Sequence, residues 1–179
     1  MQYIDELIRS MNYLSDNKDT IFLGQGLKTD VSYMFQTFRD VPQNKKIELP
    51  VVEELQMGMT IGLALDGKIP ITIYPRWDFL ILASNQLINH LDKINKFNYN
   101  FDYRIKTIIR VGVGSNRPLN PQCQHTGDYT NAFRNMLETV DVIQLIEPRQ
   151  IFDSYQRALE RDDNKSTMLV EYGYYYKTK

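Results

Sequence analysis

A carboxyl group that follows a buried strand and begins a helix can hold a proton beside a bound ligand. Glu53 has this position, because it comes after the short run 46–49 and opens the apolar, helix-like segment 55–65. A second apolar run, 69–74, comes next, and a long segment with helical periodicity, 78–97, follows it. This order predicts that Glu53 lies at the carboxyl edge of a parallel sheet, where open α/β sheets bind their ligands.

The position of Glu53 also has a plainer interpretation. A negative charge in the first turn of a helix stabilises that helix by about 0.3–1 kcal/mol, and position alone favours this role. Glu54 points elsewhere on the same helix and fits the plain role better still. The position of Glu53 alone therefore does not establish a chemical role, and other observations must support one.

Two loops carry further candidates. His125 lies in the long polar loop 115–130 and could act as an acid, a base or a hydrogen-bond donor, although an exposed polar residue is the simpler interpretation. The turn 24–26, Gly-Gln-Gly, follows the predicted strand 20–23 and could hold a phosphate. Neither the dinucleotide-binding fingerprint nor a P-loop is present, so a plain turn is the simpler prediction.

Apolar strands alternate with helices along the chain. The other predicted helices cover 3–14, 31–38 (a short one), 131–138 and 149–161, and the other strands cover 20–23, 103–113, 140–146 and 166–171. Strands that are apolar on both faces belong in a sheet covered on both sides. The sequence therefore predicts an α/β fold, in which a parallel β-sheet carries helices on both faces.

The two helices after Glu53 have distinctive faces. In helix 78–97, helical spacing groups Phe79, Leu82, Ala83, Gln86, Leu87, His90 and Leu91. His90 is accordingly predicted to be a core or interface histidine. Gly58 and Gly62 lie one turn apart in helix 55–65, and a glycine in a helix interior costs about 1 kcal/mol. We therefore expect another helix, from this chain or from a partner, to pack closely against them.

The composition narrows the class of protein. The chain has 179 residues and a formal net charge of −1, and this balance gives no indication of the clustered basic surface that binds nucleic acids or anionic membranes. Residues 1–179 are expected to form one domain. No apolar run approaches the ~18 residues of a membrane span, and no signal pattern begins the chain, which predicts a cytoplasmic protein.

Cys123 is the only cysteine, and no cluster has metal-ligand spacing. The tyrosine-rich end, 172–176, is expected to pack on this chain or on a partner.

These residues stand in a pattern that resembles a known family. Residues 50–71 read Pro-Val-Val-Glu-Glu-Leu-Gln-Met-Gly-Met-Thr-Ile-Gly-Leu-Ala-Leu-Asp-Gly-Lys-Ile-Pro-Ile. This is similar to the pyrimidine-binding domain of transketolase-like, thiamine-diphosphate-dependent enzymes, in particular the β-subunit of 2-oxo-acid dehydrogenases. There the pattern is Pro-Ile-Ser-Glu, then Gly, Gly-x-Ala, Gly and Pro at the same spacing. The runs 77–79, 85–89, 110–114 and 124–125 continue the resemblance.

The resemblance implies a thiamine-diphosphate-binding fold and a cofactor site. Glu53 matches the glutamate whose carboxyl donates a proton to the pyrimidine ring, which favours the imino form that takes the proton from the thiazolium carbon. A poorly hydrated interface would favour such a carboxyl in its protonated form. Phe79 matches the aromatic residue that stacks on the pyrimidine, and Trp77 is its aromatic neighbour in the motif. The implied catalytic residues are Glu53 and His125, and the implied cofactor-binding residues are Glu53, Phe79 and Trp77.

The resemblance also implies a partner. The chain lacks the Gly-Asp-Gly…Asn motif that binds diphosphate through a metal ion, and it ends where the family's carboxyl-terminal swivelling domain would begin. We therefore expect a stand-alone subunit of a split enzyme, active only with a diphosphate-binding, α-like subunit that holds the Mg²⁺. A dimer or an α2β2 assembly would act on a 2-oxo acid or a ketose, as a dehydrogenase or decarboxylase or as a transketolase-like transferase.

Some residues depart from the family pattern. Val52 replaces the serine before the glutamate, Asn85 replaces the aspartate of an Asp-Gln pair, and Gly112 or Val113 replaces a proline. Val52 and Asn85 favour an alternative, a non-catalytic interaction protein that keeps the fold and the dimer interface, whereas the presence of Glu53, Phe79 and His125 argues against it. A second alternative is an unrelated flavodoxin-like binding module, which would need an anion-binding loop such as 24–26.

Overall fold

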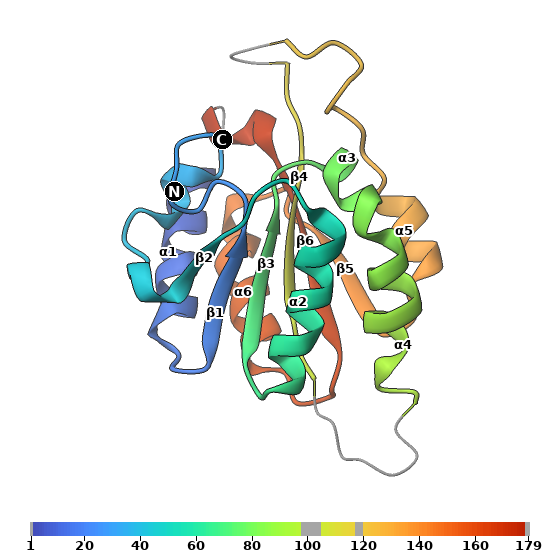
Figure 1. Ribbon diagram of the computed structural model, residues 1–179. Helices are drawn as coiled ribbons and strands as arrows, with labels where there is room; N and C mark the ends of the chain where they lie inside the picture. Colours follow the sequence, from blue (N-terminus) through green and yellow to red (C-terminus); the bar gives the residue numbers. More distant parts are fainter. Residues whose placement is uncertain (1, 98–104, 117–119, 178–179) are drawn as a thin grey trace.

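The computed structural model describes residues 2–97, 105–116 and 120–177. In these residues, six parallel strands form one sheet in the order β2-β1-β3-β4-β6-β5 (Figure 1). The strands are β1 (Thr20–Gly24), β2 (Lys46–Glu48), β3 (Ile69–Tyr74), β4 (Ile108–Val113), β5 (Val140–Gln144) and β6 (Ser166–Tyr172). The predicted parallel sheet is therefore confirmed.

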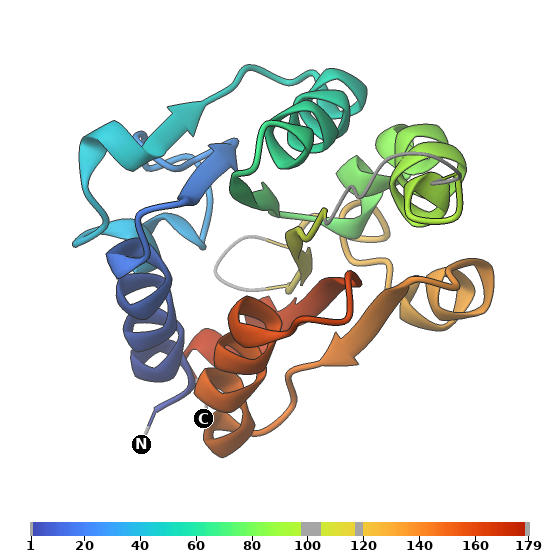
Figure 2. The same cartoon turned by 90° about the horizontal axis from the view of Figure 1, so that it is seen from below.

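Helices cover both faces of the sheet (Figure 2). One face carries α1 (Tyr3–Asp16) and α6 (Pro148–Glu160), and the other carries α2 (Glu53–Leu65), α3 (Trp77–Leu80), α4 (Asp92–Ile94) and α5 (Thr130–Met136). Each face has its own apolar cluster. In β6, Leu169 joins the cluster under α1 and α6, whereas Met168 and Val170 join the opposite cluster, because side chains alternate along a strand. The predicted α/β fold with helices on both faces is confirmed.

The predicted helix 78–97 is present but irregular. After α3 come a 3₁₀ turn, η3 (Ile81–Ala83), and a π-helical segment, η4 (Gln86–Leu91), which leads into α4. A 3₁₀ turn holds fewer residues than an α-helical turn, and a π turn holds more. The side chains that face the core therefore differ from those expected for a regular α-helix. Leu82 is 61% exposed, and His90 is exposed as well. The prediction that Leu82 shares the buried face of this helix was wrong, and so was the core alternative for His90, whereas an interface role for His90 stays a prediction.

Other boundaries differ by a few residues. β4 begins at Ile108, so the predicted strand 103–113 is too long at its start, and Tyr103 lies outside the described residues. The short helix predicted near 31–38 is a 3₁₀ turn, η1 (Phe35–Phe38), and a second such turn, η2 (Gln43–Lys45), precedes β2. α6 begins with Pro148 in its first turn, one residue before the predicted start at 149, because that position needs no amide hydrogen.

A buried ion pair ties the end of the chain to the sheet. Arg110 of β4 and Glu171 of β6 are both 0% exposed, and Arg110 Nη2 donates to Glu171 Oε2 at 2.9 Å. The hydroxyls of Tyr155 and Tyr176 donate to the same carboxylate. Burial, followed by the charge of Glu171, raises the pKa of both hydroxyls well above the usual value. Tyr176 lies in the final 3₁₀ turn, η5 (Gly173–Lys177), so the expected packing of the tyrosine-rich end is found at this residue.

The outer face of α2 carries an apolar stripe formed by Leu55, Gly58, Gly62 and Leu65. A Cβ built on Gly58 or Gly62 meets no atom within 4 Å, so no helix in the described part of the chain packs against them. Leu55 is 58% exposed and Leu65 is 42% exposed. The close packing expected at these glycines is therefore not found among the described residues, and a partner surface remains the prediction.

The helices are short on the scale of a membrane. Within residues 2–97, 105–116 and 120–177, no helix is long and apolar enough to cross a bilayer.

Candidate functional site

A cavity opens at the carboxyl edge of the sheet, where β1 and β3 end side by side. The connection after β1 contains η1, which packs against α1, whereas the connection after β3 enters α3 on the opposite face. Neighbouring strands that send their connections to opposite faces leave a crevice between them. Such a switch point is the usual ligand site of an open α/β sheet.

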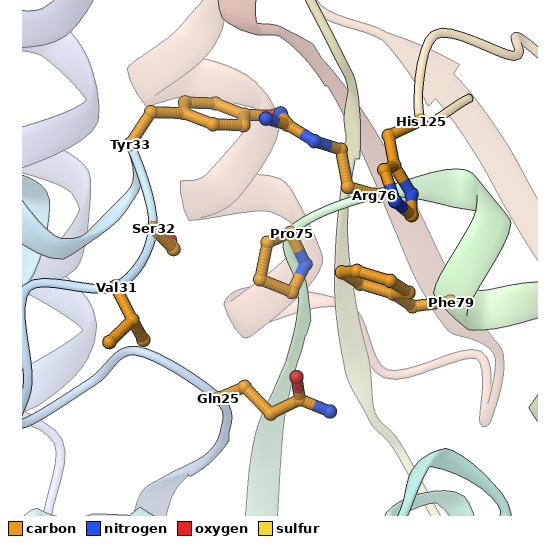
Figure 3. Close-up of a pocket in the computed structure, with 8 residues that line it drawn as sticks. All are labelled: Gln25, Val31, Ser32, Tyr33, Pro75, Arg76, Phe79 and His125. Carbon is orange, nitrogen blue, oxygen red and sulfur yellow. The ribbon is translucent and has the colours of Figure 1, made fainter. Parts of the chain in front are cut away.

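The cavity is small and partly polar. Its volume is about 200 Å³, and its lining includes Gln25, Tyr33, Pro75, Arg76, Phe79 and His125 (Figure 3). Gln25 follows β1, whereas Pro75 and Arg76 follow β3. No carboxylate contributes to this lining. The cavity therefore combines an aromatic wall with hydrogen-bonding groups.

Glu53 lies next to this cavity and is linked to it through Gln25. It is the first residue of α2 and is only 4% exposed. Gln25 Nε2 donates to Glu53 Oε1 at 3.1 Å, and the Tyr74 hydroxyl donates to the Glu53 carbonyl at 3.3 Å. Glu54 is exposed, and its contact is with Gln86 at 3.4 Å. The two neighbouring acids thus have the different surroundings predicted for them.

The amide groups after β1 bind a carboxylate from the chain itself. The Glu48 side chain accepts hydrogen bonds from the amides of Gly26, Leu27 and Lys28 at 2.6, 2.7 and 2.5 Å. The three N–H groups that could have held a phosphate are therefore already occupied. This finding agrees with the plain-turn interpretation of 24–26 and removes the support that this loop gave to a flavodoxin-like binding module. The sequence analysis did not identify Glu48.

Phe79 and His125 come together although they are far apart in the sequence. Their ring centres are 5.1 Å apart with an interplanar angle of 54°, and both residues line the cavity. Nδ1 of His125 is buried without a hydrogen-bond partner in the described residues. The His125 backbone has φ of 62°, an unusual value for a residue with a side chain. The loop is therefore held in a particular conformation beside Phe79.

Two glycines at the end of β4 make room for the walls of the cavity. A Cβ on Gly112 would collide with the Tyr33 hydroxyl and would lie 2.5 Å from the Pro75 carbonyl oxygen. A Cβ on Gly114 would collide with the His125 carbonyl and would lie 3.1 Å from Cδ of Arg76. Glycine at both positions is thus needed for the loops that carry Tyr33 and His125 to approach the sheet.

Trp77 does not line the cavity. Its side chain is 0% exposed and packs against Phe133, with ring centres 4.9 Å apart. The indole therefore fixes the start of α3, the helix that carries Phe79, and contact between Trp77 and a cofactor remains a prediction. Arg76, Gln25 and Tyr33 were not identified from the sequence as site residues, because no spacing rule connects the loop after β1, which carries Gln25 and Tyr33, with the loop after β3, which carries Arg76.

Two solved structures have the same fold. One is a split-gene transketolase, described as an inactive β4 tetramer, with a TM-score of 0.66 and 15% identity over 95% of this chain and 50% of that chain. The other is a 2-oxoglutarate:ferredoxin oxidoreductase from Magnetococcus marinus with 2-oxoglutarate, coenzyme A and succinyl-CoA bound, with a TM-score of 0.60 and 10% identity over 96% of this chain and 29% of that chain. The chain has a transketolase-like fold.

The transketolase-like fold implied by the sequence resemblance is thereby confirmed. This chain spans half the length of the transketolase chain and less than a third of the oxidoreductase chain. No protein-family model matches the sequence, and no curated protein matches it. The comparisons therefore establish the fold and leave the activity of the assembled protein to be proposed.

Proposed function

We propose that this chain is the pyrimidine-binding subunit of a split thiamine-diphosphate-dependent enzyme that acts on a 2-oxo acid or a ketose. One observation carries the proposal. The Glu53 carboxyl is buried at the start of α2 and is joined through Gln25 to a cavity at the switch point of the sheet. The transketolase-like fold supports the same function.

The residues present fit the pyrimidine part of the cofactor. Phe79 offers an aromatic face in the wall of the cavity, and a flat aromatic ring stacks well on such a face. Glu53 offers a carboxyl group that can share a proton with a ring nitrogen. The cavity volume of about 200 Å³ is below the ~300–1,000 Å³ of typical ligand pockets. A site completed by a second subunit agrees with this size.

Each residue of this chain has a distinct part in the proposed reaction. Thiamine diphosphate, when bound, would supply a nucleophilic carbon for chemistry at the carbonyl group of the substrate. Glu53 holds a proton at the pyrimidine nitrogen, and the side-chain amide of Gln25 keeps the Glu53 carboxyl in position. Phe79 supports the ring, and Trp77 anchors the helix that carries Phe79. His125 donates a hydrogen bond to an oxygen of the substrate.

The diphosphate and the Mg²⁺ belong, in this proposal, to an α-like partner subunit. No group of three or more His, Cys, Asp or Glu that could hold a metal ion occurs in the described part of this chain. The stripe of Leu55, Gly58, Gly62 and Leu65 on α2 supplies an apolar surface for assembly, as a dimer or an α2β2 complex. Apolar patches of this kind mark interaction sites on soluble proteins.

The isolated chain is expected to bind thiamine diphosphate weakly or not at all, because the described part of the chain has no group of side chains that could hold the metal ion of the diphosphate. The complex with the diphosphate-binding subunit should bind the cofactor tightly and only with magnesium present. Isothermal titration calorimetry with and without magnesium measures both cases. A tight, magnesium-dependent site in the isolated chain would contradict the division of roles between two subunits.

Replacing Gly62 by leucine is expected to block assembly without harming the fold. The space above Gly62 is open, so the new side chain does not clash inside the chain, and removing a helix-interior glycine favours the helix by up to about 1 kcal/mol. In a close interface the same side chain would hold the partner away. Multi-angle light scattering after gel filtration gives the mass, and urea unfolding gives the stability.

The matched control for Gly62→Leu is Asp153→Leu. Asp153 is exposed on α6, which covers the opposite face of the sheet, so this substitution adds a surface leucine away from the stripe. Its complex should keep the mass of the unmodified protein. If Gly62→Leu also leaves the mass unchanged, the interface lies elsewhere on the chain.

A further inference from the structure

Arg76 is a charged residue of the cavity that the proposed reaction does not use. It follows β3 and Pro75, and its side chain runs along the cavity towards the ring of Tyr33 (Figure 3). Its Cζ atom lies 4.7 Å from the centre of that ring. Its Nη1 atom is buried and has no hydrogen-bond partner among the described residues. A buried N–H group of a charged side chain is costly to leave without an acceptor.

A second interior arginine shows what a purely structural role looks like in this fold. Arg110 lies on the neighbouring strand, and its guanidinium is paired with Glu171 and also donates to Thr37 at 2.7 Å. Arg76, in contrast, forms no ion pair with a carboxylate in the described part of the chain. The positive charge at the cavity is thus left available for an anion from outside the chain.

Two other polar groups line the same cavity. Nδ1 of His125 is buried without a hydrogen-bond partner in the described residues, and the buried Tyr33 hydroxyl lies beside the Arg76 side chain and meets no other hydrogen-bond partner there. Burial raises the pKa of Tyr33 far above its usual value, and the nearby Arg76 charge opposes that rise. The Tyr33 hydroxyl therefore stays protonated and can donate a hydrogen bond. Three groups that can donate hydrogen bonds line one cavity that has no carboxylate in its wall.

We propose that Arg76, with Tyr33 and His125 beside it, binds the anionic group of the substrate, a carboxylate or a phosphate. A guanidinium is well suited to both groups, because its fixed N–H donors match the oxygens of a carboxylate or a phosphate. Phe79 lines the same cavity, so an anion held there lies beside the proposed cofactor site. The inference rests on the proposed function only in identifying the bound anion as the substrate. It adds that Arg76 recognises the negative charge of the substrate, which a 2-oxo acid carries on its carboxylate and a ketose would carry on a phosphate.

Titration of the isolated, ¹⁵N-labelled chain with small probes tests this site by arginine side-chain NMR at constant ionic strength. The probes are pyruvate for a carboxylate, inorganic phosphate for a phosphate, and acetone as the uncharged control. Arg76→Met removes the charge but keeps most of the stem, whereas Arg76→Lys keeps the charge. Arg149→Met is the matched control, since Arg149 is exposed on α6 and does not line the cavity.

Pyruvate or phosphate should shift the Arg76 Nε–H signal in a saturable way, and acetone should not. Binding, followed through the His125 ring signals, should weaken at least about tenfold in Arg76→Met, because a charge-assisted hydrogen bond is lost. Arg76→Lys should restore part of it, and Arg149→Met should bind normally. A stronger response to pyruvate indicates a 2-oxo acid, and a stronger response to phosphate indicates a sugar phosphate. Unchanged affinity in Arg76→Met, or no response of Arg76 to either anion, would overturn the proposal.

Cofactor binding separates this inference from the proposed function. If the complex binds thiamine diphosphate by calorimetry but Arg76 binds neither anion, only the anion site is wrong. If Arg76 binds an anion but the complex binds no thiamine diphosphate, the anion site stands and the proposed function is wrong.

Discussion

Replacing Arg110 by methionine is expected to destabilise the folded chain by about 3–5 kcal/mol, the usual cost of breaking a buried ion pair by removing one partner. The substitution leaves the Glu171 carboxylate at 0% exposure without its counter-charge. It also removes the donors to Thr37 and to the Tyr176 hydroxyl, at 2.7 and 3.0 Å. Burial alone would disfavour the charge of Arg110, but Glu171 outweighs it and holds the pKa of Arg110 well above the usual value. Urea unfolding followed by circular dichroism measures the loss.

Two further variants show whether the charge is responsible. Arg149→Met changes an exposed arginine and should alter the stability by no more than about 0.5 kcal/mol. The double variant Arg110→Met, Glu171→Gln should recover part of the loss, because it removes both charges together. A midpoint for Arg110→Met equal to that of Arg149→Met would show that the ion pair contributes nothing to the fold.

The fold was predictable because its strands are apolar on both faces. Runs such as 69–74 and 166–171 contain no polar alternation, and only a sheet covered on both sides accommodates them. The alternation of strands and helices along the chain predicted Glu53 at the start of the helix after β2, and Glu53 is the first residue of α2. The aromatic and loop motifs implied that Phe79 and His125 share a site, and the structure brings their rings within 5.1 Å.

The polar details of the site could not be predicted in the same way. The Glu48 carboxylate binds the amides after β1 because Gly24 and Gly26 adopt φ of 146° and 72° and leave these amides exposed. No propensity rule specifies which carboxylate then binds them. Arg76 and Tyr33 meet at the cavity only because Gly112 and its neighbours let two loops approach the sheet. The burial of Trp77 and the exposure of His90 follow from α3 and from the 3₁₀ and π turns after it, which a fixed helical period does not represent.

Replacing Glu53 by glutamine is expected to slow proton exchange at the thiazolium carbon of the bound cofactor by orders of magnitude. At about 1.4 kcal/mol per tenfold change, this is a loss of at least several kcal/mol of barrier stabilisation. Glutamine is nearly isosteric with glutamate, and its carbonyl oxygen can still accept the hydrogen bond from Gln25, which spans 3.1 Å in the unmodified chain. The fold and most of the cofactor affinity should therefore be kept. An amide cannot share a proton with the pyrimidine nitrogen as a carboxyl group does.

Glu54→Gln provides the internal control. Glu54 is the next residue of α2, but it is exposed and meets Gln86 at 3.4 Å, away from the cavity. Both residues lie in the first turn of α2, so each variant removes an acid from the helix start. A difference between them therefore reports on the cavity alone.

Hydrogen–deuterium exchange of the bound cofactor, measured by quenched NMR in the assembled complex, distinguishes a cofactor-activating Glu53 from an ordinary helix-start acid. We expect exchange that is slower by orders of magnitude in Glu53→Gln and nearly unchanged in Glu54→Gln, with thiamine diphosphate bound in both. Equal and small effects from the two variants would contradict it. Glu53 would then be an ordinary acid at the start of a helix, and the chain would be a non-catalytic member of its assembly.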